Sequence, residues 1–151
     1  MAHEVEAGLQ KPKLRAFRME DYRQVRTVWK DSGLEVRPGD SRKEIRRKLK
    51  RDPELFLVAE VEGKIVASVI GAWDGRRGWI YHLGVRPGHH RRRVATRLVR
   101  EVETRMRRKG VLKVNVLIFP WNESSIRFFS KIGYFIADMK EAQKSLAAGK
   151  G

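Results

Sequence analysis

The sequence predicts a single α+β domain built around a mixed β-sheet. Three segments rich in β-branched and aromatic residues follow one another with only short turns between them, which is typical of an antiparallel meander. An amphipathic segment and another apolar segment come next, and this order predicts two parallel strands joined by a right-handed helical crossover. Because no internal repeat or interior linker interrupts the pattern, we expect one domain over residues 14–146, a flexible tail at 1–13 and a frayed end at 147–151.

The first third of the chain predicts a short strand and two helices. Residues 14–17 could form the strand, and Asp21 is placed to cap a helix that ends at Gly33. The apolar positions of this helix share one face: Tyr22, Val25, Val28 and Trp29. Ser41 and Glu44 have the spacing of a capping box and open a second helix with a narrow apolar face.

The middle of the chain supplies the meander and the crossover helix. Its three strands are expected at residues 55–61, 65–73 and 79–85. The hairpin turns between them are Glu62-Gly63 and Asp74-Gly75. Apolar residues then recur at helical spacing, which predicts a helix that ends at Gly110.

The last third predicts a strand, a helix and a final strand. Residues 112–119 are expected to form the second parallel strand, and Asn122 caps a helix that runs to Gly133. Residues 134–146 could add a further strand to the sheet.

An arginine cluster lies where the third meander strand gives way to the crossover helix. Residues 85–98 read Val-Arg-Pro-Gly-His-His-Arg-Arg-Arg-Val-Ala-Thr-Arg-Leu. The first N–H groups of a helix have no partner within the helix and attract anions, so residues 91–93 beside them would match a pyrophosphate. A solvated basic turn is the alternative.

The same segment resembles the pyrophosphate-binding loop of the GNAT superfamily of N-acetyltransferases. The residues that match its pattern are Val85, Pro87, Arg91, Arg92, Ala95 and Leu98. A second signature of that family resembles Asn122, Ser125, Phe128, Phe129, Gly133 and Tyr134. Both motifs occur in the family's order on the expected elements, and the resemblance covers roughly residues 14–138.

The resemblance implies helices on both faces of the sheet and a transferase that moves an acetyl group from acetyl-CoA directly to an amine. That amine could be a protein N-terminus, a lysine or a small molecule. Acetyl-CoA would lie where the strands at 79–85 and 112–119 splay apart, with its pyrophosphate on the loop amides. The implied cofactor-binding residues are Leu83, Gly84, Val85, His90, Arg91, Arg92, Arg93, Val94, Ala95, Thr96, Asn122, Ser125, Phe128 and Phe129.

Two positions depart from the family pattern. The family usually has glycine at the position of Arg93, because a side chain there crowds the phosphates. It usually has tyrosine at the position of Phe129, and phenylalanine has no proton to give to the departing thiolate. These departures leave open a catalytically degenerate acyl-CoA-binding module with a regulatory role.

Tyr81 and His82 are the candidates for the missing acid or base. The period of two along a strand predicts that they face opposite sides of the sheet. An imidazole titrates near neutral pH and can accept a proton from an ammonium group. The alternatives are a structural His82 packed beneath a helix with its ring hydrogen-bonded, and a Tyr81 that is simply part of the core. The four histidines lack a second ligand cluster, so we expect no metal site.

The charge balance predicts an anionic partner. The 151 residues include 34 Lys and Arg against 18 Asp and Glu, a formal net charge of +16. Residues 42–51 are strongly basic and could recruit an acidic acceptor or form a solvated helix face. A nucleic-acid- or ribosome-associated module is the alternative from another class, with nonspecific nucleic-acid binding as a side effect of charge.

The remaining expectations concern location and assembly. No apolar run approaches the roughly 20 residues that span a bilayer, and the first residues lack the apolar stretch of a secretory signal. The chain also has no cysteine, so we expect a cytoplasmic protein without a membrane partner. The segment 134–146 lies where many members of the family pair or swap strands, and it could form a homodimer.

Overall fold

The computed structural model describes residues 11–89 and 93–148, which fall into two compact units that divide after Leu117. In the described residues, the first unit holds the β-sheet and three α-helices, and the second unit holds the last α-helix. The single-domain boundaries at 14 and 146 stay a prediction.

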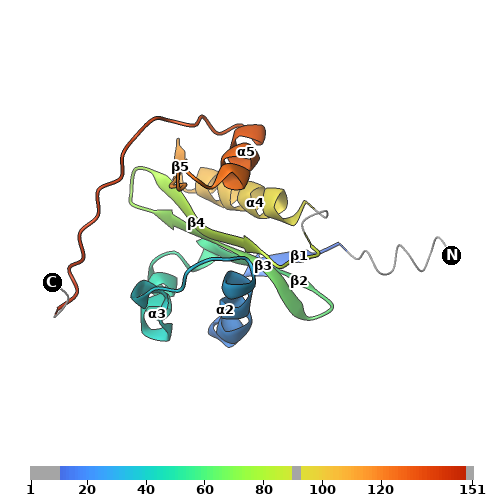
Figure 1. Ribbon diagram of the computed structural model, residues 1–151. Helices are drawn as coiled ribbons and strands as arrows, with labels where there is room; N and C mark the ends of the chain where they lie inside the picture. Colours follow the sequence, from blue (N-terminus) through green and yellow to red (C-terminus); the bar gives the residue numbers. More distant parts are fainter. Residues whose placement is uncertain (1–10, 90–92, 149–151) are drawn as a thin grey trace. The chain divides into compact units, whose positions relative to one another are not determined.

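The described part of the first unit is built on a five-stranded sheet in the order β1-β2-β3-β4-β5 (Figure 1). Its strands are β1 (Lys13–Ala16), β2 (Phe56–Val61), β3 (Lys64–Trp73), β4 (Gly78–Val85) and β5 (Val114–Val116). Adjacent strands from β1 to β4 pair antiparallel, whereas β4 and β5 pair parallel. The α+β class, the antiparallel meander and the parallel strand–helix–strand unit are therefore confirmed.

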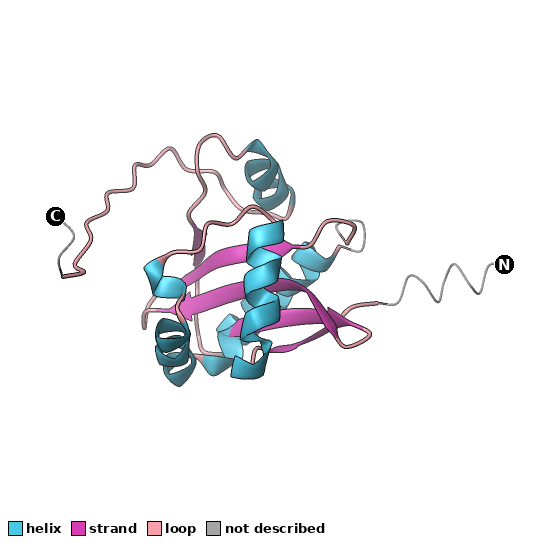
Figure 2. Cartoon of the chain, turned by 60° about the horizontal axis from the view of Figure 1, so that its bottom comes forward, coloured by secondary structure: helices cyan, strands magenta, loops and turns pink. Residues whose placement is uncertain are grey.

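Helices cover both faces of this sheet. They are α2 (Tyr22–Asp31), α3 (Arg42–Arg51) and α4 (Val94–Arg108). Two glycines show how closely each face is covered, because a side chain at either position would collide with the covering element. A Cβ atom on Gly84 of β4 would lie 2.6 Å from Oγ of Ser32, directly after α2. A Cβ atom on Gly71 of β3 would lie 2.9 Å from Cγ1 of Val102 in α4. Figure 1 shows α2 and α3 on one face and α4 on the other, and Figure 2 shows the face that α2 crosses.

The core on the α2 face joins this helix to β2 and β3. Trp29 and Phe56 are fully buried with ring centroids 6.4 Å apart, and Phe17 stacks on Phe56 at 4.1 Å. The other buried members of the cluster are Tyr22, Val25, Val28, Ile45, Val58, Ile65 and Ile70. Fully burying each large apolar side chain contributes about 1.5–3 kcal/mol. The predicted apolar face of the first helix is thus confirmed.

Two local predictions in the first unit are wrong. Asp21 precedes α2, but its carboxylate accepts hydrogen bonds from the Arg18 amide at 2.8 Å and from Arg15 instead of capping the helix. The strand expected at 112–119 is only three residues long, because its register with β4 ends at the Ile80–Val116 pair.

The described part of the second unit contains α5 (Glu123–Lys131) and the segments on either side of it. The Asn122 cap is confirmed, since its Oδ1 accepts a hydrogen bond from the Ser125 amide at 3.2 Å. Gly133 follows with a φ of 103°, a left-handed value that favours glycine. No strand forms within residues 134–146, all of which are described, so the final strand expected there is wrong. Phe135 and Leu146 are exposed, and no ladder pairs their backbone.

Throughout 11–89 and 93–148, the helices are too short or too polar to cross a bilayer.

Candidate active site

A β-bulge in β4 positions the candidate acid and base. The register between β3 and β4 shifts between Ser68 and Ile70, and His82 adopts a left-handed φ of 51°. The rings of Tyr81 and His82 lie 5.6 Å apart in a T-shaped arrangement. The expectation that these side chains face opposite sides of the sheet is therefore wrong, because the extra residue at the bulge interrupts the alternation of the strand.

His82 is paired with Asp40, a residue from a different part of the chain. Its Nε2 lies 2.9 Å from Oδ1 of Asp40. Asp40 ends the short 3-10 turn η2 (Pro38–Asp40) between α2 and α3 and is 7% exposed. Its Oδ2 accepts the Arg37 amide at 3.0 Å, and its backbone oxygen accepts the Tyr22 hydroxyl at 2.7 Å. These hydrogen bonds fix the carboxylate against the imidazole.

The electrostatics of this pair fix the tautomer of the neutral imidazole. Burial of the Asp40 carboxyl raises its pKa, but the hydrogen bonds from His82 and the Arg37 amide outweigh burial and bring the pKa below its usual value. Asp40 is therefore ionised at neutral pH and can only accept hydrogen bonds. The proton of the neutral ring then lies on Nε2, which leaves the lone pair of Nδ1 to accept a proton.

The His82 ring also packs against α2. Its centroid lies 5.1 Å from that of Trp29 in a T-shaped contact. This packing, with the ring hydrogen-bonded, meets the description of a structural histidine. The side chain is nevertheless 22% exposed, so water or a substrate can reach it. The position of His82 is therefore compatible with a role as a proton acceptor as well as with a structural role.

Tyr81 carries a hydroxyl that stays protonated at physiological pH. Burial, together with the negative charges of Asp52 and Asp40, raises its pKa to about 12. The residue is 39% exposed, so it is not part of the closed core. Such a hydroxyl can donate a hydrogen bond to a developing thiolate, but with a pKa of about 12 it holds its proton more tightly than a free thiol, whose pKa is about 8.5.

Beyond residue 80, β4 has no strand on its β5 side among the residues that the structure describes. β5 pairs only with residues 78–80, whereas Gly84 and Val85 pair with β3 on the other side. Leu83, Gly84 and Val85, the residues predicted to pair with the pantetheine arm, all lie in this stretch. An unpaired strand edge presents N–H and C=O groups that an extended ligand can pair with.

The crossover helix α4 begins beside the predicted phosphate loop. Arg93 occupies the N-cap position with a left-handed φ of 54°, is exposed, and makes no side-chain cap. The Arg97 amide donates to the Arg93 carbonyl at 3.0 Å and starts the helical hydrogen bonds. The first-turn residues, whose amides lack partners within the helix, are Val94, Ala95 and Thr96. The predicted loop residues that lie outside the described part of the chain are His90, Arg91 and Arg92.

The remaining predicted cofactor residues belong to the second unit. Asn122 and Ser125 are joined by the cap of α5. The Phe128 and Phe129 rings lie 5.0 Å apart, and Phe129 also contacts the Tyr134 ring at 5.1 Å. This aromatic group therefore orders the end of α5, and Phe129 has no proton to supply.

Sequence reasoning missed Asp40, which the structure places against His82. The two residues are 42 positions apart, and no local pattern links a loop aspartate to a strand histidine at that separation. Within 11–89 and 93–148, no three His, Cys, Asp or Glu side chains are grouped so that they could hold a metal ion.

Comparison with known proteins relates the chain to acetyltransferases. Residues 15–134 match the model of the acetyltransferase (GNAT) family. An acetyltransferase of Sodalis glossinidius (strain morsitans) is 39% identical over 126 residues, which cover 83% of this chain and 88% of that protein.

Two solved structures share the fold. Ard1 from Thermoplasma volcanium superposes with a TM-score of 0.76 at 23% identity over 85% of both chains. The PaiA N-acetyltransferase from Thermoplasma acidophilum, solved in complex with coenzyme A, superposes with a TM-score of 0.79 at 18% identity, covering 87% of this chain and 94% of that one.

Proposed function

Because the match spans residues 15–134, this chain belongs to the acetyltransferase (GNAT) family and is an acyltransferase, and we propose that it moves the acetyl group of acetyl-CoA directly to an amine. The acceptor is a protein N-terminus, a lysine or a small molecule. The observation that carries the proposal is the His82–Asp40 pair at the bulge, directly before the unpaired edge of β4.

The described residues fit acetyl-CoA. The backbone of Leu83, Gly84 and Val85 has the free edge that an amide-containing pantetheine arm needs. The first-turn amides of α4, which lack partners within the helix, suit the pyrophosphate. Bound there, the co-substrate would supply an activated acetyl thioester. Asn122 and Phe128 belong to this proposal by family resemblance.

His82 is proposed as the general base. An amine attacks a thioester only when it is neutral, so a proton must leave the ammonium group. Nδ1 of His82 accepts that proton directly or through one water, while Asp40 holds the ring and stabilises the imidazolium that forms.

Tyr81 is proposed as the acid in place of the missing hydroxyl at Phe129. Its high pKa keeps the hydroxyl protonated, so the hydroxyl can donate a hydrogen bond to the thiolate as it develops. Its ring lies against that of His82, so one bulge places both groups.

The test is an acetyl-transfer assay on the purified chain. Free-thiol release from acetyl-CoA should depend on added amine, and mass spectrometry should show one acetyl group on the acceptor. Acetyl-CoA should also raise the melting temperature, since it binds only the folded state. A panel of N-terminal peptides, lysine peptides and small amines that gives no release above background would contradict the proposal.

A further inference from the structure

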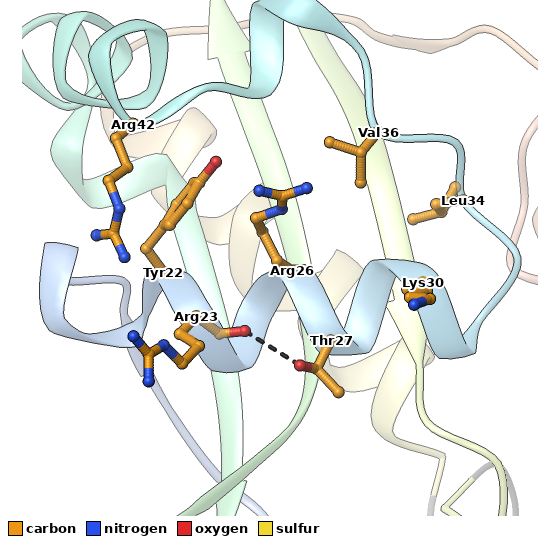
Figure 3. Close-up of a pocket in the computed structure, with 8 residues that line it drawn as sticks. All are labelled: Tyr22, Arg23, Arg26, Thr27, Lys30, Leu34, Val36 and Arg42. Atoms are coloured by element: carbon orange, nitrogen blue, oxygen red, sulfur yellow. Dashed lines mark hydrogen bonds between the residues drawn. The ribbon is translucent and has the colours of Figure 1, made fainter.

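A basic groove lies on the outer side of α2, away from the sheet. It has a volume of about 580 Å³ and is bounded by α2, the connection that follows it and the first residue of α3 (Figure 3). Its cations are Arg23, Arg26, Lys30 and Arg42, and its apolar wall is formed by Leu34 and Val36. The volume lies within the range of about 300–1,000 Å³ that is typical of ligand sites.

The four cations of this groove have no carboxylate partners within the described residues. Every Asp and Glu from residue 20 to residue 44 is engaged elsewhere. The carboxylates Glu20, Asp21, Asp31, Glu35, Asp40 and Glu44 pair with Arg18, Arg15, Arg86, Arg37, His82 and Arg47, respectively. The groove therefore holds concentrated positive charge that its own surroundings do not neutralise.

We propose that this groove docks an acidic segment of the acceptor, so that the substrate is an amine-bearing peptide or protein with clustered carboxylates. The identity of that ligand as an acceptor depends on the proposed acetyl transfer. Tyr22 links the groove to the base, because its ring lies under the Arg26 and Arg42 guanidinium groups and its hydroxyl donates to Asp40, the partner of His82.

The groove suits a peptide better than a nucleic acid. Single-stranded nucleic acids bind through exposed aromatic faces on which bases stack. Tyr22 is the aromatic residue among the lining residues, and it is 4% exposed, with the Arg42 guanidinium carbon 4.6 Å from its centroid. Leu34 and Val36 can instead contact the aliphatic parts of a peptide.

The first experiment measures binding without catalysis. Fluorescence anisotropy compares a fluorescein-labelled glutamate-rich peptide with its glutamine counterpart of equal length. Wild-type protein should bind the glutamate peptide at least about tenfold more tightly, and added salt should reduce the difference. The double variant Arg23→Glu/Arg26→Glu should lose at least about tenfold in affinity for the glutamate peptide.

The matched control is Arg100→Glu/Arg107→Glu, which makes the same charge change at exposed positions of α4 on the opposite face of the sheet. It should bind the glutamate peptide within about twofold of wild type. Circular dichroism checks that both variants fold. Equal binding of the two peptides, equal losses in both variants, or tighter binding of an oligouridine that the groove variant also loses would each overturn the docking proposal.

A kinetic arm separates this inference from the proposed function. With the glutamate peptide as acceptor, the groove variant should raise KM at least about tenfold and leave kcat within about twofold of wild type. Groove-dependent binding without any acetyl transfer would contradict the enzymatic proposal and leave the docking site intact. Transfer to glutamine and glutamate peptides with equal KM would overturn the docking site and leave the transfer intact.

Discussion

His82 in β4 and Arg93 before α4 share a backbone conformation, but their side chains have different environments. Both are non-glycine residues in the left-handed region, with φ values of 51° and 54°. His82 has a carboxylate at 2.9 Å and the Trp29 ring at 5.1 Å, whereas Arg93 is exposed and makes no side-chain cap.

The difference separates two uses of the same strained conformation. A side chain in the left-handed region costs about 1–2 kcal/mol, so it persists where the surrounding structure holds it. At His82, the bulge and the Asp40 contact hold a partly exposed imidazole directly before the free edge of β4. At Arg93, the helix start imposes the conformation and the side chain contributes nothing to holding it. Substitution should therefore damage function at the first residue and not at the second.

The largest expected effect is at His82. Asparagine tolerates the left-handed region, so His82→Asn should fold while kcat/KM for acetyl transfer falls about 100-fold. The pH–rate profile should also lose the limb that reports the proton acceptor. Glu62→Asn is the matched control, because Glu62 has the same φ of 51° in a surface turn, and it should keep full activity. An unchanged pH–rate profile in His82→Asn would mean that the histidine is structural.

Asp40→Asn should lower kcat/KM about 30-fold, because the amide no longer stabilises the imidazolium or fixes the tautomer. It should also change how stability depends on pH. The pKa of Asp40 is lowered by folding, so the ionised carboxylate stabilises the fold above the unfolded-state value of about 3.9, and this contribution disappears as pH falls through the lower folded-state pKa.

Urea unfolding measured from pH 7 down to pH 3 checks the direction of this change in stability with pH. The free-energy difference between wild type and Asp40→Asn should be largest at neutral pH and shrink in acid. Asp31→Asn, which removes the partner of Arg86 away from the His82 pair, should leave activity near that of wild type. A stability difference that stays constant over this pH range would contradict the assigned role of Asp40.

Tyr81→Phe should reduce turnover about tenfold and leave the KM for acetyl-CoA unchanged, because only the hydrogen-bond donor to the developing thiolate is lost. A second substitution sharpens the result. Phe129→Tyr places a hydroxyl where the family usually has one, and in the Tyr81→Phe background it should restore turnover. Wild-type turnover in Tyr81→Phe would exclude this hydroxyl as the acid.

The smallest effect is expected at Arg93. Arg93→Gly should raise the free energy of unfolding by about 0.5 kcal/mol, since glycine relieves the left-handed strain but costs chain entropy. Acetyl-CoA should bind equally or up to about threefold more tightly, because the side chain near the phosphates is removed. Glu62→Gly should give the same stabilisation without any change in acetyl-CoA affinity. A clear loss of affinity in Arg93→Gly would show that the guanidinium has become a phosphate ligand.

Much of the fold could be predicted because its signals are local. The β-branched and aromatic stretch of β3, the hairpin turns and the Ser41 cap each involve neighbours in sequence, and all three are found in the structure. The shortness of β5 could not be predicted, because it depends on where two strands diverge in space. The sequence of residues 112–119 remains apolar well beyond the last pair.

The candidate site is predictable only in part for the same reason. His82 could be identified from its position directly before residues 83–85, which are predicted to pair with the pantetheine arm. The bulge that turns its ring toward Tyr81 could not, because it comes from a register shift between β4 and β3. Asp40 reaches His82 through tertiary contact alone. The cytoplasmic location, a homodimer and nonspecific nucleic-acid binding stay predictions.

Amide hydrogen–deuterium exchange with and without acetyl-CoA tests the central claim most directly. Binding along the free edge of β4 and the first turn of α4 should slow exchange at residues 83–85 and 94–96, and His82→Asn should show the same protection because it affects only the chemical step. Unchanged exchange at both segments, in a protein whose melting temperature acetyl-CoA nevertheless raises, would place the co-substrate elsewhere and contradict the account.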